Sequence, residues 1–251
     1  RQQLLYLASK RIEKTHREII NQNFELIYNL AIISKFASSS ITYEIAFSLY
    51  PLDIFAAQAL TLSIQRYGQN ERTLFSFLEA TGQGSLQAFK EKVNTAYNLA
   101  DVYDYDIYNF YSYLSEANAD STAWTSIRVG LERVEGLFEG EIATDAIKLV
   151  KTIGMLNLFG KAGVQLEKEK LATYAKFALG IENSEEIIEL LTQHKIIRYA
   201  TYKSQYILFE GTDVNIEGEL LKAAGIVPRS KDVVEKPVSY THLTLPTNSR
   251  A

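Results

Sequence analysis

The sequence contains no cysteine, only three histidines and a single methionine. The absence of cysteine excludes disulfides, thiol catalysis and cysteine-based zinc sites from this chain. The histidines, His16, His194 and His242, are far apart in the sequence, so they offer little from which to build a metal site. Because a cysteine-free composition is compatible with a reducing compartment, we expect a cytoplasmic protein.

Long apolar runs, a basic charge excess and the common catalytic motifs are also missing. No apolar run approaches the roughly 18 to 20 residues that a membrane-spanning helix needs, so we expect a soluble protein with no membrane partner. The 26 Lys and Arg against 30 Asp and Glu give a formal net charge of −4, so any contact with DNA must be local. The chain has no GxxxxGK(S/T), GxGxxG, HExxH or GxSxG motif, and we do not expect a stand-alone enzyme.

Both ends of the chain differ from an ordinary protein sequence. The chain begins at Arg1 and its methionine is Met155, so we expect an interior piece of a longer protein. Residues 237–251 have no helical period and hold two of the four prolines. They resemble translated sequencing-adapter read-through, and we expect a non-native tail; the alternative is a genuine disordered tail. In either case the segment, with His242, is left out of the fold prediction.

The remaining sequence predicts a mainly α fold. Apolar residues recur every three or four positions up to about residue 180, the period of amphipathic helices. Near the end of the folded region, helices expected at 142–159, 167–179 and 184–195, the last capped by Ser184, are followed by two β-prone runs around a polar turn at 196–209. Three helices and a hairpin are the element order of a winged helix-turn-helix.

The clearest signals for the start and end of helices surround Arg72. Asp53 is placed to cap a helix that runs to Arg66, Gly68 follows its end, and Asn70 is placed to cap a second helix from Glu71 to about residue 80. Arg72 therefore falls in the first turn of a helix, where a cation opposes the macrodipole by roughly 0.3 to 1 kcal/mol. This position favours a nearby anion; the alternative is pairing of Arg72 with a carboxylate elsewhere in the same helical domain, the lid defined below.

The charges of the predicted winged helix disfavour base reading by its third helix. That helix carries Glu182, Glu185, Glu186 and Glu189, which have the wrong sign for phosphates. The hairpin offers four residues for contact with a DNA backbone, the alternative being a structural or interdomain wing: Arg198, Tyr199, Tyr202 and Lys203. The aromatic stretch from Tyr97 to Tyr113 is interleaved with aspartates and is expected to pack in the core rather than to stack on bases.

Several strings together resemble a known family. They are YPLD at 50–53, QNERTLFSFL at 69–78, the helix of Trp124, KTI at 151–153 and YILFEGTDVNIE at 206–217. In order and spacing they resemble the C-terminal half of large bacterial P-loop ATPases of AAA type, some of which look like phage-defence or DNA-associated proteins. The similarity covers residues 45–225. The family tends to have Tyr-Pro-Leu-His-Pro at the positions of residues 50–54, whereas this chain has Asp53 and Ile54 in place of the last two. The departure weakens any role assigned to the missing histidine.

The resemblance implies a nucleotide-binding α/β core, then a helical lid, then a winged helix. In such lids an arginine at the start of a helix contacts the γ-phosphate of ATP, and Arg72 matches that placement, with Asn70 and Glu71 beside it. ATP and Mg²⁺ are then expected only in the intact protein, because the phosphate-binding loop and the magnesium ligands would lie upstream of Arg1. The N-terminal ATPase core would be the principal partner.

This interpretation divides the chain into five segments. They are a helical segment that packs on the upstream core (1–40), a lid-like helical domain (41–140), a winged helix (141–217), a C-terminal helix or linker (218–236) and the tail (237–251). In the intact protein the module would relay ATP state to DNA or to a protein partner. The alternative is a DNA-binding or protein-interaction scaffold with no nucleotide role; a purely helical interaction platform is a third possibility.

Overall fold

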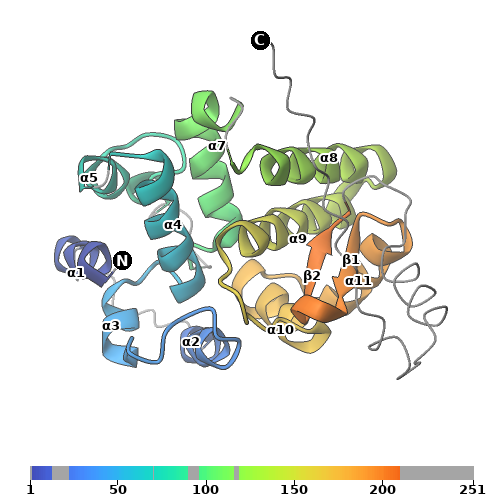
Figure 1. The fold of residues 1–251 in the computed structure, drawn as a ribbon, viewed down its shortest axis with the longest axis horizontal. Helices are drawn as coiled ribbons and strands as arrows, with labels where there is room; N and C mark the ends of the chain where they lie inside the picture. The colour runs from blue at the N-terminus through green and yellow to red at the C-terminus, as the bar shows by residue number, and fades with distance from the viewer. Residues whose placement is uncertain (1, 13–22, 70, 90–95, 116–118, 210–251) are drawn as a thin grey trace, which may run out of the picture. The chain divides into compact units, whose positions relative to one another are not determined.

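The computed structural model describes residues 2–12, 23–69, 71–89, 96–115 and 119–209. Its first half consists of helices α1 (Gln2–Arg11), α2 (Asn23–Ile33), α3 (Tyr43–Ser48), α4 (Ile54–Tyr67), α5 (Glu71–Glu79) and α6 (Leu86–Phe89) (Figure 1). Its second half consists of α7 (Leu99–Ser115), α8 (Ser121–Leu137), α9 (Gly140–Phe159), α10 (Lys168–Leu179) and α11 (Ser184–Gln193), then β1 (Ile197–Ala200), a 3₁₀ turn (Thr201–Lys203) and β2 (Gln205–Leu208). The expected mainly α fold with a small hairpin is confirmed. Asn70 and residues 210–251, with the end of the expected winged helix, the linker and the tail, lie outside the described residues.

Helix α4 is the most deeply buried of the described helices. Asp53 caps it as expected, accepting a hydrogen bond from the backbone N–H of Ala56 at 2.7 Å, and every residue from Ile54 to Ile64 is buried. A helix that is apolar on nearly all sides needs neighbours all round. α4 has them in α1, α2, α5, α7 and α9.

The N-terminal helices pack on this chain. α1 contacts α3, α4 and α5, while α2 contacts α3, α4 and α10. The apolar face of α2, with Phe24 and Ile27, is buried in these contacts. The described residues all belong to one compact unit, and packing continues across positions 40 and 140; the five-segment division stays a prediction.

Helices α8 and α9 lie side by side and connect the bundle to the hairpin. Gly154 of α9 faces Ile127 of α8 so closely that a Cβ at position 154 would clash with the isoleucine side chain. α9 also packs against α7 and α11. The hairpin packs on α8, α9 and α11, and Asn157 of α9 holds β2 directly: its Nδ2 donates to Tyr206 O at 2.9 Å, and its Oδ1 accepts from Leu208 N at 3.4 Å.

Some local expectations are wrong. Ser184 is the first residue of α11 rather than its cap; Asn183 holds the cap position, and its side chain makes no capping hydrogen bond. Tyr97, Tyr103, Tyr105 and Phe110 are buried as expected, but Tyr108 and Tyr111 are exposed. The reason is geometric: α7 has one outward side, and these two residues, three positions apart, share it.

Candidate functional site

The turn between α4 and α5 places Arg72. Gly68 ends α4 as expected, and Gln69 N donates to Thr73 Oγ1 at 2.7 Å. A Cβ at Gly68 would lie 2.9 Å from both Ile64 O and Thr73 Oγ1, so the turn is closed tightly against the two helices. Arg72 stands in the first turn of α5, as predicted, and its side chain is exposed.

Arg72 borders a shallow depression of about 610 Å³. Its lining comes from α5 and the residue that follows it: Glu71, Arg72, Phe75, Ser76, Glu79 and Ala80. Among the described residues no carboxylate pairs with the Arg72 guanidinium. The expected alternative of a carboxylate partner in the lid is therefore not seen in the part of the chain that the structure describes.

The depression offers few donors for an anion. Arg72 supplies a guanidinium and Ser76 a hydroxyl, whereas Glu71 and Glu79 are carboxylates that repel further phosphates. Within the described ranges no cluster of three or more metal-ligating side chains exists. A nucleoside triphosphate and its Mg²⁺ would have to be held mainly by residues outside this depression.

The hairpin divides its four candidate residues between different surfaces. Arg198 lies opposite Ile207, and Tyr199 lies opposite Tyr206. Because successive strand residues point to opposite faces, Arg198 and Tyr199 do not share a face; the tyrosine pairs with the Tyr206 ring at 5.3 Å.

The tip of the hairpin is the part that faces solvent. Tyr202 is 68% exposed, and the Lys203 Nζ lies 5.6 Å from the centre of its ring.

The four glutamates of the third winged-helix segment are exposed as well: Glu182, Glu185, Glu186 and Glu189. Two of them pair with Lys176 and Lys168 of α10. The outer face of α11 is thus acidic, whereas the hairpin tip presents an aromatic ring beside a cation. His194, expected at a helix end, is the C-cap of α11 and packs against Phe138.

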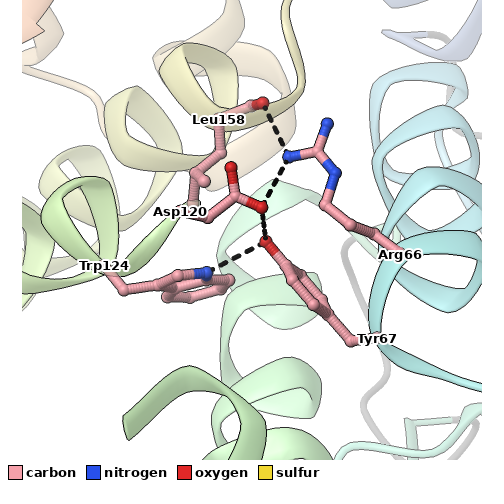
Figure 2. Close-up of polar contacts among 5 residues, drawn as sticks. All are labelled: Arg66, Tyr67, Asp120, Trp124 and Leu158. Carbon is pink, nitrogen blue, oxygen red and sulfur yellow. Dashed lines mark hydrogen bonds and ion pairs between the residues drawn. The ribbon is translucent and has the colours of Figure 1, made fainter. Parts of the chain in front are cut away.

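Sequence reasoning did not find a polar cluster at the end of α4, which Figure 2 shows. We call it the α4 terminal cluster: Arg66, Tyr67, Asp120, Trp124 and Leu158. Asp120 Oδ2 accepts from Arg66 Nη1 at 3.1 Å and from the Tyr67 hydroxyl at 2.7 Å, and Trp124 Nε1 donates to that hydroxyl at 3.1 Å. Arg66 Nη1 also reaches Leu158 O at 3.5 Å. Burial, reinforced by Asp120, raises the pKa of Tyr67 to about 12.

A weak local signal for this cluster exists in the sequence. Asp120 precedes the helix of Trp124, which is the usual place for a capping residue. In the structure Asp120 occupies the cap position of α8, but its side chain makes no capping hydrogen bond and turns toward α4 instead. The partners are more than fifty residues apart, so only the packed helices reveal the cluster.

Two carboxyl groups are fully buried. Asp53 accepts from the Tyr174 hydroxyl at 2.8 Å, and burial raises its pKa to about 7. Asp106, one of the aspartates interleaved with the aromatic stretch, lies inside the bundle, accepts from Ser63 and has one oxygen with no hydrogen-bond partner. Burial raises the pKa of Asp106 well above its ordinary value.

Comparison with protein-family models, with curated proteins and with solved structures found no match. In the described part of the chain, no helix combines the length and the apolar character that crossing a membrane requires. The function must therefore be argued from the site itself.

Proposed function

We propose that the chain supplies the nucleotide-sensing lid and the winged-helix module of an AAA-type ATPase. The observation that carries the proposal is Arg72, an exposed cation in the first turn of α5 with no carboxylate partner among the described residues. A guanidinium so placed opposes the helix macrodipole unless an anion approaches. The depression beside it is lined by the Arg72 guanidinium and the Ser76 hydroxyl, and in the proposal these donors contact the γ-phosphate of ATP.

In this proposal Arg72 closes the lid when the γ-phosphate is present. Asn70 and Glu71 precede it in the sequence, and the nucleotide itself is held by a core outside this chain. The second part of the proposal concerns α9, α10, α11 and the hairpin, which follow one another in the winged-helix order. These elements would pass the lid movement to DNA or to a protein partner.

The test uses the intact protein. Sequencing the reading frame upstream of the Arg1 codon should find a GxxxxGK(S/T) loop followed by an acidic magnesium-binding strand. In the purified full-length protein, Arg72→Ala should lower ATP hydrolysis by about tenfold or more while ATP binding changes less. Arg128→Ala is the matched control, since this arginine is also exposed on a helix surface. A frame without the loop, or equal hydrolysis by the two variants, would reject the nucleotide role.

A second candidate function is nonspecific contact with a phosphate backbone by the hairpin. It is favoured by the exposed Tyr202 and Lys203 at the tip, and by Arg198 on β1. The acidic face of α11 argues against base reading by that helix. This function requires no nucleotide.

The second candidate is tested by fluorescence anisotropy with a labelled DNA duplex at several salt concentrations. Two phosphate contacts should give a slope of log K against log salt of about −2. Lys203→Glu should weaken binding equally for unrelated sequences, whereas Lys161→Glu, an exposed lysine in the α9–α10 loop, should change it little. Absence of binding at low salt would leave the hairpin as a structural wing.

A further inference from the structure

The last three residues of α9, residues 157–159, contact both the hairpin and the end of α4. Asn157 binds the backbone of β2 on both sides of its amide group. The next residue, Leu158, accepts from Arg66, and the ring of Phe159 lies 5.1 Å below the Arg66 guanidinium. At about 1.5 Å per residue, the end of α4 and the hairpin are thus attached within one turn of the same helix.

At its other end, the α4 terminal cluster adjoins the α4–α5 turn, which carries Arg72. Arg66 and Tyr67 are the last two residues of α4, and Gly68 N donates to Ile64 O at 2.9 Å. Gly68 lies so close to Ile64 and Thr73 that an added Cβ would clash with both, and we infer that a shift of the first turn of α5 also moves the last turn of α4. A displacement of Arg72 would therefore reach the α4 terminal cluster next, because Arg66 and Tyr67 are in that last turn.

The ion pair of this cluster, between Arg66 and Asp120, is open to water, whereas the hydrogen bond from Trp124 to Tyr67 is buried. The Arg66 side chain is 38% exposed and that of Asp120 is 23% exposed, unlike the apolar contacts around them. Hydrogen bonds and ion pairs at such a site have a bonded and a water-separated arrangement of similar free energy. Packed apolar side chains, in contrast, lose contacts when they separate. Helices α4, α8 and α9 can therefore change their relative positions at this cluster at a lower cost in free energy than at their apolar contacts.

We propose that the α4 terminal cluster is a mechanical relay, in which a movement of the α4–α5 turn passes through Arg66 and Tyr67 to the end of α9 and through Asn157 to the hairpin. The relay is a property of the described packing. Its use as a response to nucleotide rests on the proposed function.

Hydrogen exchange of the whole chain, measured without nucleotide, tests the relay. Tyr67→Phe removes the hydroxyl that joins Asp120 to Trp124. Exchange of the β2 amides, above all Leu208 N–H, should rise by about fivefold, the factor that corresponds to one hydrogen bond. Tyr28→Phe is the matched control: it also removes a tyrosine hydroxyl bond, from Tyr28 to Ile41 O at 2.9 Å, but on α2.

Coupling between two sites is reciprocal, which supplies a second measurement. Asn157→Ala loosens the hairpin end and should speed exchange of Gln69 N–H, whose acceptor is Thr73. It should also change the fluorescence of Trp124, the only tryptophan of the chain. Both variants should speed exchange at the distant site beyond what their change in unfolding midpoint explains.

The relay is overturned if Tyr67→Phe speeds β2 exchange no more than Tyr28→Phe does, or if exchange rises uniformly with the loss of stability. These outcomes are distinct from those that test the nucleotide role. Coupled exchange together with an Arg72→Ala variant of normal ATPase activity would keep the relay and reject the sensor. Loss of ATPase activity with uncoupled exchange would keep the sensor and reject the relay.

Discussion

At the scale of single residues, the two buried carboxyl groups make the stability of the chain depend on pH. Burial favours the protonated form of each, so the folded state binds these protons more tightly than the unfolded state does. The resulting stability is full below the unfolded pKa of 3.8 and is lost as pH rises through the folded pKa. For Asp53, whose folded pKa is about 7, the loss between pH 4 and pH 7 is roughly 3 kcal/mol.

Asp106→Asn should reduce this dependence. The amide keeps an oxygen that can accept from Ser63 and never ionises, so the variant avoids a charge inside the bundle. We expect the urea midpoint of the variant to exceed that of the parent chain at pH 7 and to approach it at pH 4. Glu169→Gln, a change of the same kind on the surface, is the control. A parent chain whose midpoint is flat between pH 4 and pH 7 would contradict the burial argument.

At the scale of elements, the contact between α8 and α9 depends on two glycines. Gly154 leaves room for Ile127, and a Cβ at Gly130 would lie 3.1 Å from Val150 Cγ1. Each glycine weakens its helix by roughly 1 kcal/mol relative to alanine. The close approach of the two helices offsets that cost.

Gly154→Ala should therefore destabilise the chain by about 1 to 3 kcal/mol, the usual range for an overpacked core. Gly136→Ala, near the end of α8, meets no atom within 4 Å and should stabilise by about 0.5 to 1 kcal/mol. Urea unfolding of the two variants with equal slopes measures both effects. Opposite signs are expected; a stabilising Gly154→Ala would show that the helices are farther apart than described.

At the scale of the whole molecule, α2 belongs to the same packed unit as the other described helices. Ile27 is 1% exposed, whereas Ile33, on the same helix, is 64% exposed. If α2 is held by α3, α4 and α10 of this chain, as its contacts indicate, truncation of the buried isoleucine must weaken the entire unit. If α2 instead packed only on an upstream core, truncation of Ile27 would not change the stability of the unit.

We expect Ile27→Ala to lower the free energy of unfolding by about 2 to 5 kcal/mol, and Ile33→Ala to change it by less than about 0.5 kcal/mol. Thermal unfolding of the two variants, each as a single transition, provides the measurement. Similar midpoints for the two variants would mean that the first helices are not part of the unit.

The sequence by itself determined the local features of this protein. The Asp53 cap, the Gly68 stop, the place of Arg72 in a first helical turn and the hairpin after α11 are confirmed. Each depends on signals a few residues apart: helical periodicity, capping side chains and a glycine. The Ser184 cap is wrong because Asn183 and Ser184 are both suitable capping residues, and the exact start of α11 depends on how it packs.

Only the tertiary structure decided which distant residues meet. Tyr174 reaches Asp53 across 121 positions, and Arg66 reaches Asp120 across 54. Periodicity says that α7 has a buried side; it does not say that Asp106 lies on it, because an aspartate is ordinarily a surface residue. The separation of Arg198 from Tyr199 likewise requires the strand register. Contacts of this kind depend on which helix and strand faces pack together, and no signal within a few residues of sequence encodes that choice.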